Sequence, residues 1–315
     1  FHGLFLVKHF CSLGDDVYVL NRGNYKPDYD LKINHLIADR NNKGNLKKVL
    51  GNIKFDVVID NNGYNPTQLN IILKLIHGRC SHYIFTSSIA VYLKPFSDHK
   101  LKENDKKKVQ NEFYSPKVKN YALDKFYAED ALHKNSFNLK YTILRLPDVF
   151  GENDFLGKLL FFYYRFKDGG KILLEKEVER FNLIYVKDLV RIFDKVVQNE
   201  ACYGKAINIA DPNAYTYDMF FSKIYGSLYS KGKLFLIPAR KMEELKYFPL
   251  FPWGPEVDTS LSERLLGKIN FTPLDRWGPK TLKWELENLK DKTSDIEYKK
   301  TRERELELIK SIKRL

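Results

Sequence analysis

Cysteine is scarce in this sequence: there are three, Cys11, Cys80 and Cys202, and none belongs to a CxxC pair or to a His/Cys group at metal-ligand spacing. The pattern disfavours both a disulfide scaffold and a zinc module, and we predict no metal site. The chain also has no run of about 18 apolar residues, which excludes a membrane-spanning helix. We therefore expect a water-soluble protein of the reducing cytoplasm.

Acidic residues are outnumbered, since 53 lysines and arginines face 40 aspartates and glutamates and leave a net charge of +13. An excess of this size can indicate a polyanionic partner or a phosphate-bearing ligand. The lysines are spread along the chain among acidic residues, which favours a solvated surface. Binding to nucleic acid stays open as the less favoured alternative.

Strand-like and helix-like segments alternate over much of the chain. A helical pattern starts at the first residues and ends at Gly14, and another covers about 67–77. Five short segments rich in β-branched and aromatic residues are predicted strands: 16–21, which we expect to be buried, 55–60, 82–87, 140–145 and 205–209. This alternation predicts an α/β fold with a doubly wound parallel sheet that binds ligands at the carboxyl ends of its strands.

Tyr121 and Lys125 are four residues apart in a predicted helix and therefore share one face. A nearby ammonium favours the phenolate, so a phenol with an ordinary pKa of about 10 can act as a base nearer neutrality. A tyrosine and a lysine at this spacing, without further signals, are usually two side chains on the protein surface. The segment 85–92 (FTSSIAVY) alters this interpretation, because it places two serines at the end of a predicted parallel strand. A hydroxyl there can bind the oxygen that the tyrosine protonates, leaving hydride transfer to a nicotinamide.

Five motifs follow one another in a specific order. They are Phe1-His-Gly3, Ser87-Ser-Ile-Ala-Val-Tyr92, the pair Tyr121 and Lys125, Leu144-Arg-Leu-Pro-Asp-Val-Phe-Gly151, and Tyr185-Val-Lys-Asp188. Because the motifs occur in this order, the chain resembles the extended short-chain dehydrogenase/reductase family, the NAD(P)-dependent epimerase/dehydratase group, over roughly residues 1–290. The resemblance implies a Rossmann-type fold, a nicotinamide cofactor, a small-molecule substrate and pairing into homodimers.

The resemblance also implies a role for individual residues. Tyr121 is the acid/base, Lys125 its electrostatic partner and a ribose ligand, and Ser88 the ligand of the substrate hydroxyl. The further implied cofactor-binding residues are Gly3, Asn21, Arg22, Asp39, Asn61, Asn62, Gly63, Ser87 and Pro147. Of these, Asp39 meets the adenine amine and Pro147 faces the nicotinamide, whereas Ser87 has a mainly structural role.

Two departures from the family pattern concern the cofactor. The family's first strand and the first two glycines of its phosphate turn are absent, because the sequence begins at the third glycine, Gly3. We expect a truncated gene model or a fragment, since loss of a central strand removes the pairing of both its neighbours. Asn21-Arg22-Gly23 carries an arginine where an NAD-preferring member has an acid. Arg22 can pair with a 2′-phosphate, so we favour NADP over NAD.

Two other departures concern the reaction. Ile89-Ala90 follows Ser88 where the family's sugar 4,6-dehydratases carry Asp-Glu. Elimination of water needs that extra acid and base, so epimerisation or carbonyl reduction is favoured. Asp148, an implied substrate ligand, stands where many nucleotide-sugar epimerases have an asparagine near the diphosphate, and its carboxylate would repel that group. A nucleotide sugar is therefore one candidate substrate and not an established one.

We expect three parts in the chain. Residues 1–153 form the NAD(P)-binding Rossmann domain, and residues 154–290 form mainly a smaller substrate-binding region with strands that return to the main sheet. Residues 291–315 form a charged helical extension. Leu306, Ile309 and Ile312 recur there at helical spacing, which is typical of a partner-binding helix or of a solvated terminal helix, and we favour the second.

The predicted function is that of an NAD(P)-dependent epimerase or oxidoreductase with Tyr121 as acid/base. The alternative is a non-catalytic member of the same superfamily that binds RNA or senses a cofactor. RNA-binding chloroplast relatives have a similar Asn-Arg-Gly strand ending but have lost the catalytic pair. The presence of Tyr121, Lys125 and Ser88 therefore favours the enzyme.

Overall fold

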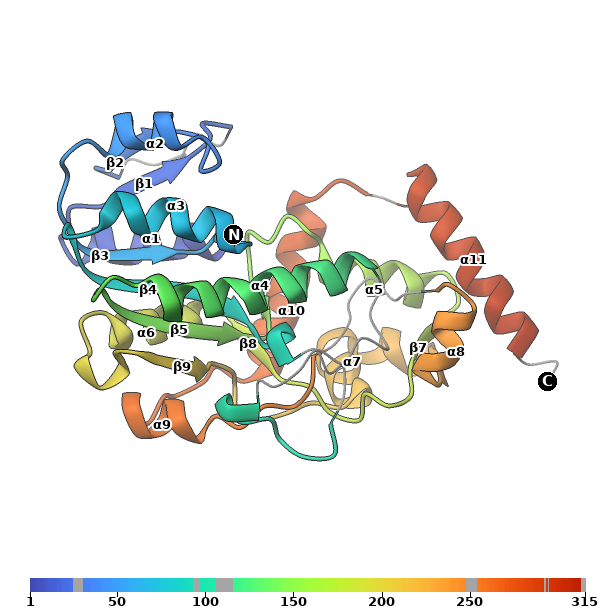
Figure 1. Cartoon of the computed structure of the whole chain (residues 1–315). Helices are drawn as coiled ribbons and strands as arrows, with labels where there is room; N and C mark the ends of the chain where they lie inside the picture. Colours follow the sequence, from blue (N-terminus) through green and yellow to red (C-terminus); the bar gives the residue numbers. More distant parts are fainter. Residues whose placement is uncertain are drawn as a thin grey trace.

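The computed structural model describes residues 1–24, 31–92, 97–105, 116–247, 254–291, 293 and 295–312. One half of the molecule consists of a parallel sheet with helices on both faces, and the other half is mainly helical (Figure 1). The amino terminus lies near the middle, between the two halves, and the last helix lies at the far end of the helical half.

The centre of the first half is a four-stranded parallel sheet in the order β3-β4-β5-β9. Its strands are β3 (Phe55–Asp60), β4 (Cys80–Ser88), β5 (Lys140–Leu146) and β9 (Lys205–Asn208). A separate parallel pair consists of β1 (Tyr18–Asn21) and β2 (Asn34–Ile37). This arrangement confirms the α/β prediction and all five predicted strand positions, whereas β2 was not predicted. Its residues, Asn34-His-Leu-Ile37, include two polar side chains and show neither an apolar run nor an alternation.

The predicted burial of the first strand is wrong. Residues of β1 are half-buried or exposed, and Tyr18 is 36% exposed. Within the described residues β1 hydrogen-bonds to β2 only, so its other edge is not covered by a paired strand. Contact with the main sheet is made instead by side chains, with the rings of Tyr18 and Phe55 at a centroid distance of 5.6 Å.

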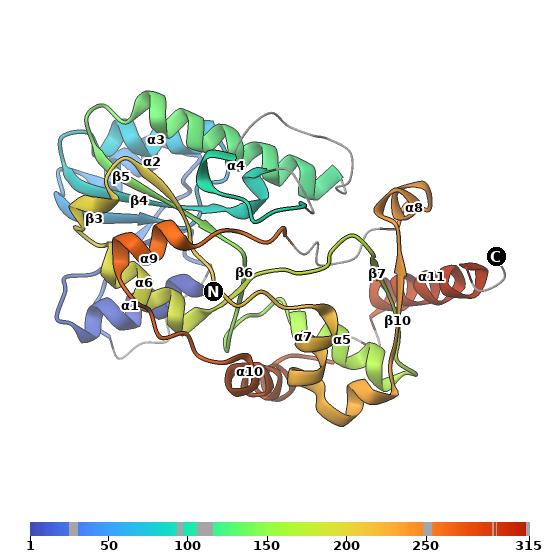
Figure 2. The ribbon, with the colours of Figure 1, turned by 90° about the horizontal axis from the view of Figure 1, so that it is seen from below.

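Helices cover both faces of this sheet (Figure 2). On one face lie α2 (Lys43–Leu50), α3 (Pro66–Ile76) and α4 (Pro116–Asn135); on the other lie α1 (His2–Ser12), α6 (Val186–Val196) and α9 (Ser260–Leu266). Local sequence fixes where α3 begins, because the Asn65 side chain accepts a hydrogen bond from the Gln68 N–H and Pro66 occupies the first turn. Leu69, Leu73 and Ile76 then pack against the sheet at helical spacing.

The second half contains two short parallel pairs and several aromatic helices. β6 (Asp148–Phe150) pairs with β8 (Leu183–Tyr185), and β7 (Lys171–Glu175) pairs with β10 (Lys233–Ile237). The helices are α5 (Lys158–Lys167), α7 (Tyr217–Tyr225), α8 (Ala239–Glu244) and α10 (Leu274–Asn288). Their core includes Phe162, Phe166 and Phe221, whose rings are in edge-on contact.

The last helix, α11 (Ile296–Ile312), is not the solvated helix that we expected. Arg302 and Glu305 are buried, 5% and 1% exposed, against α5 and β7. The Glu305 carboxylate lies 2.8 Å from Arg165 Nε and 2.7 Å from Arg302 Nη1, and it accepts a hydrogen bond from the Leu173 N–H. The sequence periodicity shows only apolar residues on this face, whereas buried charges provide much of the contact.

Candidate active site

Most of the predicted site residues gather at the carboxyl ends of β3, β4 and β5, next to α4. They are Asn61, Asn62 and Gly63 after β3, Ser88 at the end of β4, Pro147 after β5, and Tyr121 and Lys125 on α4. The three strand ends share one edge, because β4 pairs in parallel with both of its neighbours. Residues from distant parts of the chain therefore meet where the sequence predicted a ligand.

The Ser88 side chain lies close enough to the Tyr121 phenol to lower its pKa by hydrogen bonding. Tyr121 is 38% exposed, so its side chain is accessible to a ligand. Burial of the phenol nevertheless raises the pKa of Tyr121 to about 12, and the hydrogen bond to Ser88 opposes this only in part. The expectation that the Tyr/Lys pair brings this pKa towards neutrality is wrong for this structure, in which the phenol keeps its proton at neutral pH.

Lys125 is buried, and main-chain carbonyls hold its ammonium. Nζ donates to the Gly63 carbonyl at 2.8 Å and to the Thr86 carbonyl at 2.7 Å. Burial lowers the pKa of Lys125 to about 8, and the Asp60 carboxylate opposes this shift. A lysine ammonium has three N–H donors, so one remains after these two bonds. The predicted role as a ribose ligand requires such a donor.

Gly63 is buried beside this ammonium. A Cβ at position 63 would lie 2.8 Å from Phe85 Cε2 and 3.0 Å from Asp60 Oδ2, so the packing of Phe85 and Asp60 requires a glycine here. Two residues earlier, Asn61 is oriented by a hydrogen bond from Thr86 Oγ1 at 2.8 Å. An ammonium with one N–H left over and an amide fit the sugar and phosphate groups of a dinucleotide.

Local hydrogen bonds hold two of the predicted adenine-side residues. Asn21 Oδ1 accepts one from the main-chain N–H two residues further on, at 2.7 Å, and Asp39 Oδ1 accepts one at 2.9 Å in the turn before α2. The side chain of Arg22 is exposed at the end of β1. Gly3 lies in the first turn of α1, where a Cβ would be 3.6 Å from Asn61 Nδ2. Gly3 and Asn61 are therefore neighbours.

Asp148, the predicted substrate ligand, is paired with a lysine. Lys158 Nζ lies 3.6 Å from Asp148 and 3.4 Å from Asp154, and it donates to the Val149 carbonyl at 2.7 Å. Burial raises the pKa of Asp148, and the Lys158 ammonium acts against that rise. Asp148 is close enough to Tyr121 for its charge to help raise the pKa of the phenol. The carboxylate therefore belongs to the site, with part of its charge offset.

Ser87 points away from Ser88, since successive side chains of a strand face opposite sides of the sheet. Its hydroxyl donates to Glu129 Oε1 at 2.6 Å. The same carboxylate forms a buried ion pair with Arg145, which donates to the Tyr92 hydroxyl at 3.0 Å. This environment agrees with a structural role for Ser87, and it does not support a direct cofactor contact.

Comparison with known proteins assigns the family. Residues 1–210, two thirds of the chain, match the model of the NAD dependent epimerase/dehydratase family. The chain belongs to the NAD-dependent epimerase/dehydratase family. This assignment confirms the resemblance inferred from the five motifs.

One curated protein is similar to this chain over 233 residues. It is the chloroplast stem-loop binding protein of 41 kDa b of Arabidopsis thaliana, 27% identical, and the match covers 69% of this chain and 58% of the relative. The chain thus spans about 58% of that relative's length in the match.

Solved structures of epimerases and dehydratases share the fold. UDP-glucose 4-epimerase from Bifidobacterium longum, in complex with NAD+ and UDP, is 15% identical with a TM-score of 0.69, covering 91% of this chain and 96% of that one. dTDP-glucose 4,6-dehydratase from Bacillus anthracis, in complex with NAD, is 14% identical with a TM-score of 0.70, covering 91% and 94%. At these identities the likeness shows the Rossmann-like fold of the family and does not extend to substrate.

The sequence did not predict an ion pair at the edge of this site. The Asp60 carboxylate accepts two hydrogen bonds of 2.8 Å from Arg40 and one of 2.6 Å from the Tyr83 hydroxyl. Burial alone would raise the pKa of Asp60, but these donors lower it to about 2. The sequence does contain one signal for this ion pair. The predicted strand 55–60 ends in an acidic residue, Asp60, directly before the predicted site residues Asn61 and Asn62.

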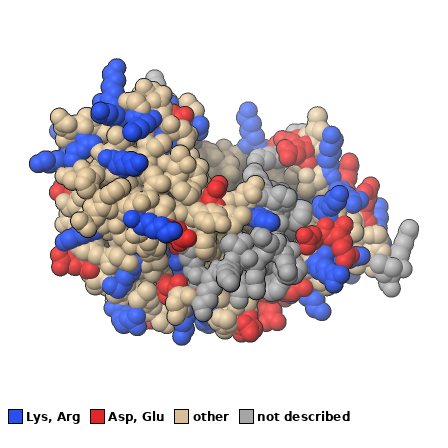
Figure 3. Space-filling view, in the orientation of Figure 1, with Lys and Arg blue, Asp and Glu red and all other residues tan. Residues whose placement is uncertain are grey.

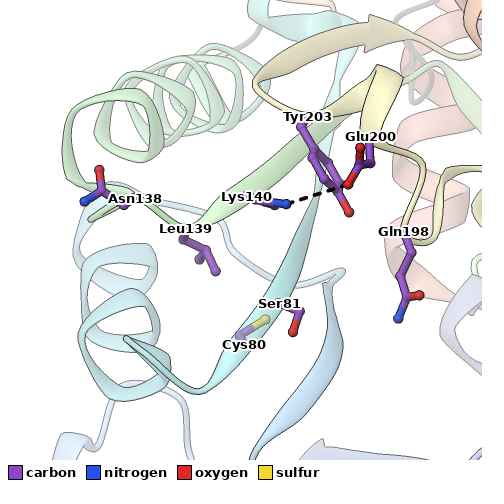
Figure 4. A pocket seen from close by; sticks show the side chains of 8 residues that line it. All are labelled: Cys80, Ser81, Asn138, Leu139, Lys140, Gln198, Glu200 and Tyr203. Carbon is purple, nitrogen blue, oxygen red and sulfur yellow. Dashed lines mark ion pairs between the residues drawn. The ribbon is translucent and has the colours of Figure 1, made fainter.

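A hollow of about 530 Å³ lies at the opposite, amino-terminal edge of the sheet (Figure 4). Cys80 and Lys140 line it at the starts of β4 and β5, with Glu200 and Tyr203 from the segment before β9. Lys140 Nζ lies 3.8 Å from the Glu200 carboxylate, and both side chains are mostly exposed. None of the predicted site residues lines this hollow. It is therefore distinct from the candidate active site.

No three His, Cys, Asp or Glu side chains in the described ranges are grouped so as to hold a metal ion. No helix in the same ranges has the length and apolar character that crossing a bilayer requires.

Proposed function

We propose that this protein is an NAD(P)-dependent epimerase or oxidoreductase that acts on a hydroxyl or carbonyl carbon of a nucleotide sugar. The observation that carries the proposal is the meeting of Tyr121, Ser88 and Lys125 beside Gly63 at the carboxyl edge of the sheet. Membership of the family supports a nicotinamide cofactor there. Lys125, Gly63 and Asn61 would hold its sugar and phosphate groups, and the bound nicotinamide would supply hydride chemistry.

Side chains of the protein itself would transfer the proton and position the substrate. The phenol of Tyr121, whose pKa burial raises to about 12, carries a proton at neutral pH and would donate it to a substrate oxygen. The Ser88 hydroxyl would hydrogen-bond the same oxygen and fix its position between the two side chains. Lys125, with two of its donors used by carbonyls, would orient the ligand rather than transfer a proton.

A nucleotide sugar is the proposed substrate class for two reasons. Solved relatives of the same fold, such as the Bifidobacterium enzyme, hold UDP together with NAD+. The repulsion that we expected between Asp148 and a diphosphate is reduced, because the Lys158 ammonium lies 3.6 Å from that carboxylate.

The test is a titration of NAD+ and NADP+ into the full-length protein, followed by incubation of the loaded protein with a panel of UDP- and dTDP-sugars. We expect saturable cofactor binding and conversion of at least one sugar, detected as an epimer or as a change in nicotinamide absorbance. Absence of binding for both cofactors would contradict the proposal.

We also propose that Arg22 selects NADP. Arg22 is exposed directly after β1, and its guanidinium would pair with a 2′-phosphate, a charge-assisted contact of roughly 1.5–3 kcal/mol. Arg22→Ala is expected to raise the Kd for NADP+ about ten- to a hundredfold and to leave the Kd for NAD+ nearly unchanged. Equal weakening of both would assign Arg22 to the shared part of the cofactor or to the fold.

A second candidate function is binding of a structured RNA. A specific observation favours it: between Asp39 and Asp56 the chain has five basic residues and no acidic one, unlike the mixed charges that we expected from the whole sequence. Lys and Arg side chains gather over α2 at the upper left of Figure 3. The Arabidopsis relative is named a stem-loop binding protein. Neither α2 nor α3 contains an aromatic residue for stacking single-stranded bases, so phosphates of a duplex stem fit this face better.

Replacing the three exposed lysines of α2 tests this candidate. Lys43→Gln, Lys47→Gln and Lys48→Gln together are expected to weaken binding of an RNA hairpin and to reduce the slope of log K against log salt by roughly 2–3, since each phosphate contact contributes about 0.7–0.9. The matched control changes three exposed lysines of α11, Lys299, Lys300 and Lys310, to glutamine. The same loss in both triple variants would indicate attraction by net charge alone.

A further inference from the structure

Tyr64 is an exposed aromatic residue beside the candidate active site. It directly follows Gly63, and its side chain is 46% exposed, whereas the neighbouring Phe85 is fully buried. Its main chain is nevertheless fixed, because its N–H donates to Gln68 Oε1 at 3.0 Å and the Gln68 amide donates to Asn41 Oδ1 at 3.0 Å. An ordered backbone therefore presents a large aromatic surface to solvent at the edge of the site.

The ring lies next to both groups of the proposed catalytic pair. Its centroid is 6.3 Å from that of Tyr121, with the planes inclined by 60°. Lys125 Nζ is 5.3 Å from the Tyr64 centroid and 4.8 Å from the Phe85 centroid, so the ammonium lies near two rings as well as two carbonyls. A ligand that accepts the remaining N–H of Lys125 would lie within reach of the Tyr64 ring.

We propose that Tyr64 is a cofactor-binding residue whose ring packs against the ribose on the nicotinamide side of NAD(P). The inference rests on the proposed function, in which Lys125 binds the hydroxyls of that sugar. A ribose presents hydroxyl acceptors on one edge and C–H groups on its face, which matches an ammonium donor and an aromatic surface side by side. The contact also covers a ring that is otherwise half open to water.

The test compares ligands that contain or lack this ribose. In the full-length protein, Tyr64→Ala is expected to raise the Kd of NADP+, NAD+ and ADP-ribose about tenfold, and to leave the Kd of ADP unchanged because ADP lacks the second ribose. Tyr64→Phe keeps the ring and is expected to bind all four ligands like the wild type. Tyr127→Ala is the matched control, since Tyr127 is a comparably exposed tyrosine (51%) on α4.

Each other outcome overturns the inference in a recognisable way. If Tyr64→Ala weakened ADP as much as NADP+, the residue would support the fold or the diphosphate region. If it weakened none of the ligands while Lys125→Met weakened NADP+, the contact would be absent and the proposed function would stand. If the wild-type protein bound neither nicotinamide cofactor, the proposed function and this inference would fall together.

Discussion

Tyr121→Phe is expected to lower turnover by about 10²-fold or more while cofactor binding is retained. The change removes the hydroxyl that hydrogen-bonds Ser88 and leaves the ring in place on α4. In the proposed mechanism this hydroxyl is the only proton carrier, and general acid–base catalysis contributes about 10²–10⁴-fold. The measurement is kcat on an identified sugar substrate together with the Kd of the cofactor, in both proteins.

Tyr127→Phe is the matched control for this variant. Tyr127 lies on the same helix and is 51% exposed, so loss of its hydroxyl tests for a general effect on α4. We expect its turnover to equal that of the wild type. Near-wild-type turnover in Tyr121→Phe would assign proton transfer to another group. A loss of cofactor binding in that variant would mean that the phenol serves binding instead of chemistry.

Glu129→Ala is expected to destabilise the fold by about 3–5 kcal/mol, because it leaves a buried guanidinium without its counter-charge. Glu129 is fully buried on α4, and its carboxylate holds Arg145 at 2.8 Å and accepts the Ser87 hydroxyl bond. Arg145 is 2% exposed in the centre of the sheet, on β5. The measurement is the free energy of unfolding from urea denaturation, compared with that of the wild type.

A double variant separates the buried charge from the lost packing. Replacing both partners, Glu129→Leu with Arg145→Met, removes the uncompensated charge and is expected to recover much of the loss. Exposed Asp124→Ala on the same helix serves as the surface control, with a change within about 0.5 kcal/mol. A loss below about 1 kcal/mol in Glu129→Ala would contradict the account of this ion pair.

Much of the fold could be predicted because its strands are short apolar runs between helices. The segments 55–60 and 82–87 match β3 and lie within β4, since β-branched and aromatic residues fill both faces of a buried parallel strand. The packing of α11 could not be predicted in this way. Its inner face is formed partly by Arg302 and Glu305, and a charged pair is recognised as buried only when Arg165 is brought to it from a distant helix.

The candidate site could be predicted as a set of residues but not as an electrostatic environment. The Tyr121/Lys125 pair follows from spacing and the two serines from a strand end, whereas the choice of Ser88 follows from the family resemblance. The structure brings the three residues together. The pKa of the phenol was predicted in the wrong direction, because spacing shows that a lysine is near and does not show how deeply the phenol is buried. Tyr64 was missed since an isolated aromatic residue after Gly63 has no periodic signal.

The most direct test of the central claim is transfer of label by the full-length protein. The protein would be given NADPH or NADH with deuterium at the hydride-donating carbon, together with keto forms of UDP- and dTDP-sugars, and the products analysed by mass spectrometry. We predict deuterium on the former carbonyl carbon of one product with the wild type, and at least about 10²-fold less with Tyr121→Phe. Cofactor binding without label in any product, accompanied by salt-sensitive binding of an RNA hairpin through α2, would contradict the enzymatic account and favour a binding protein.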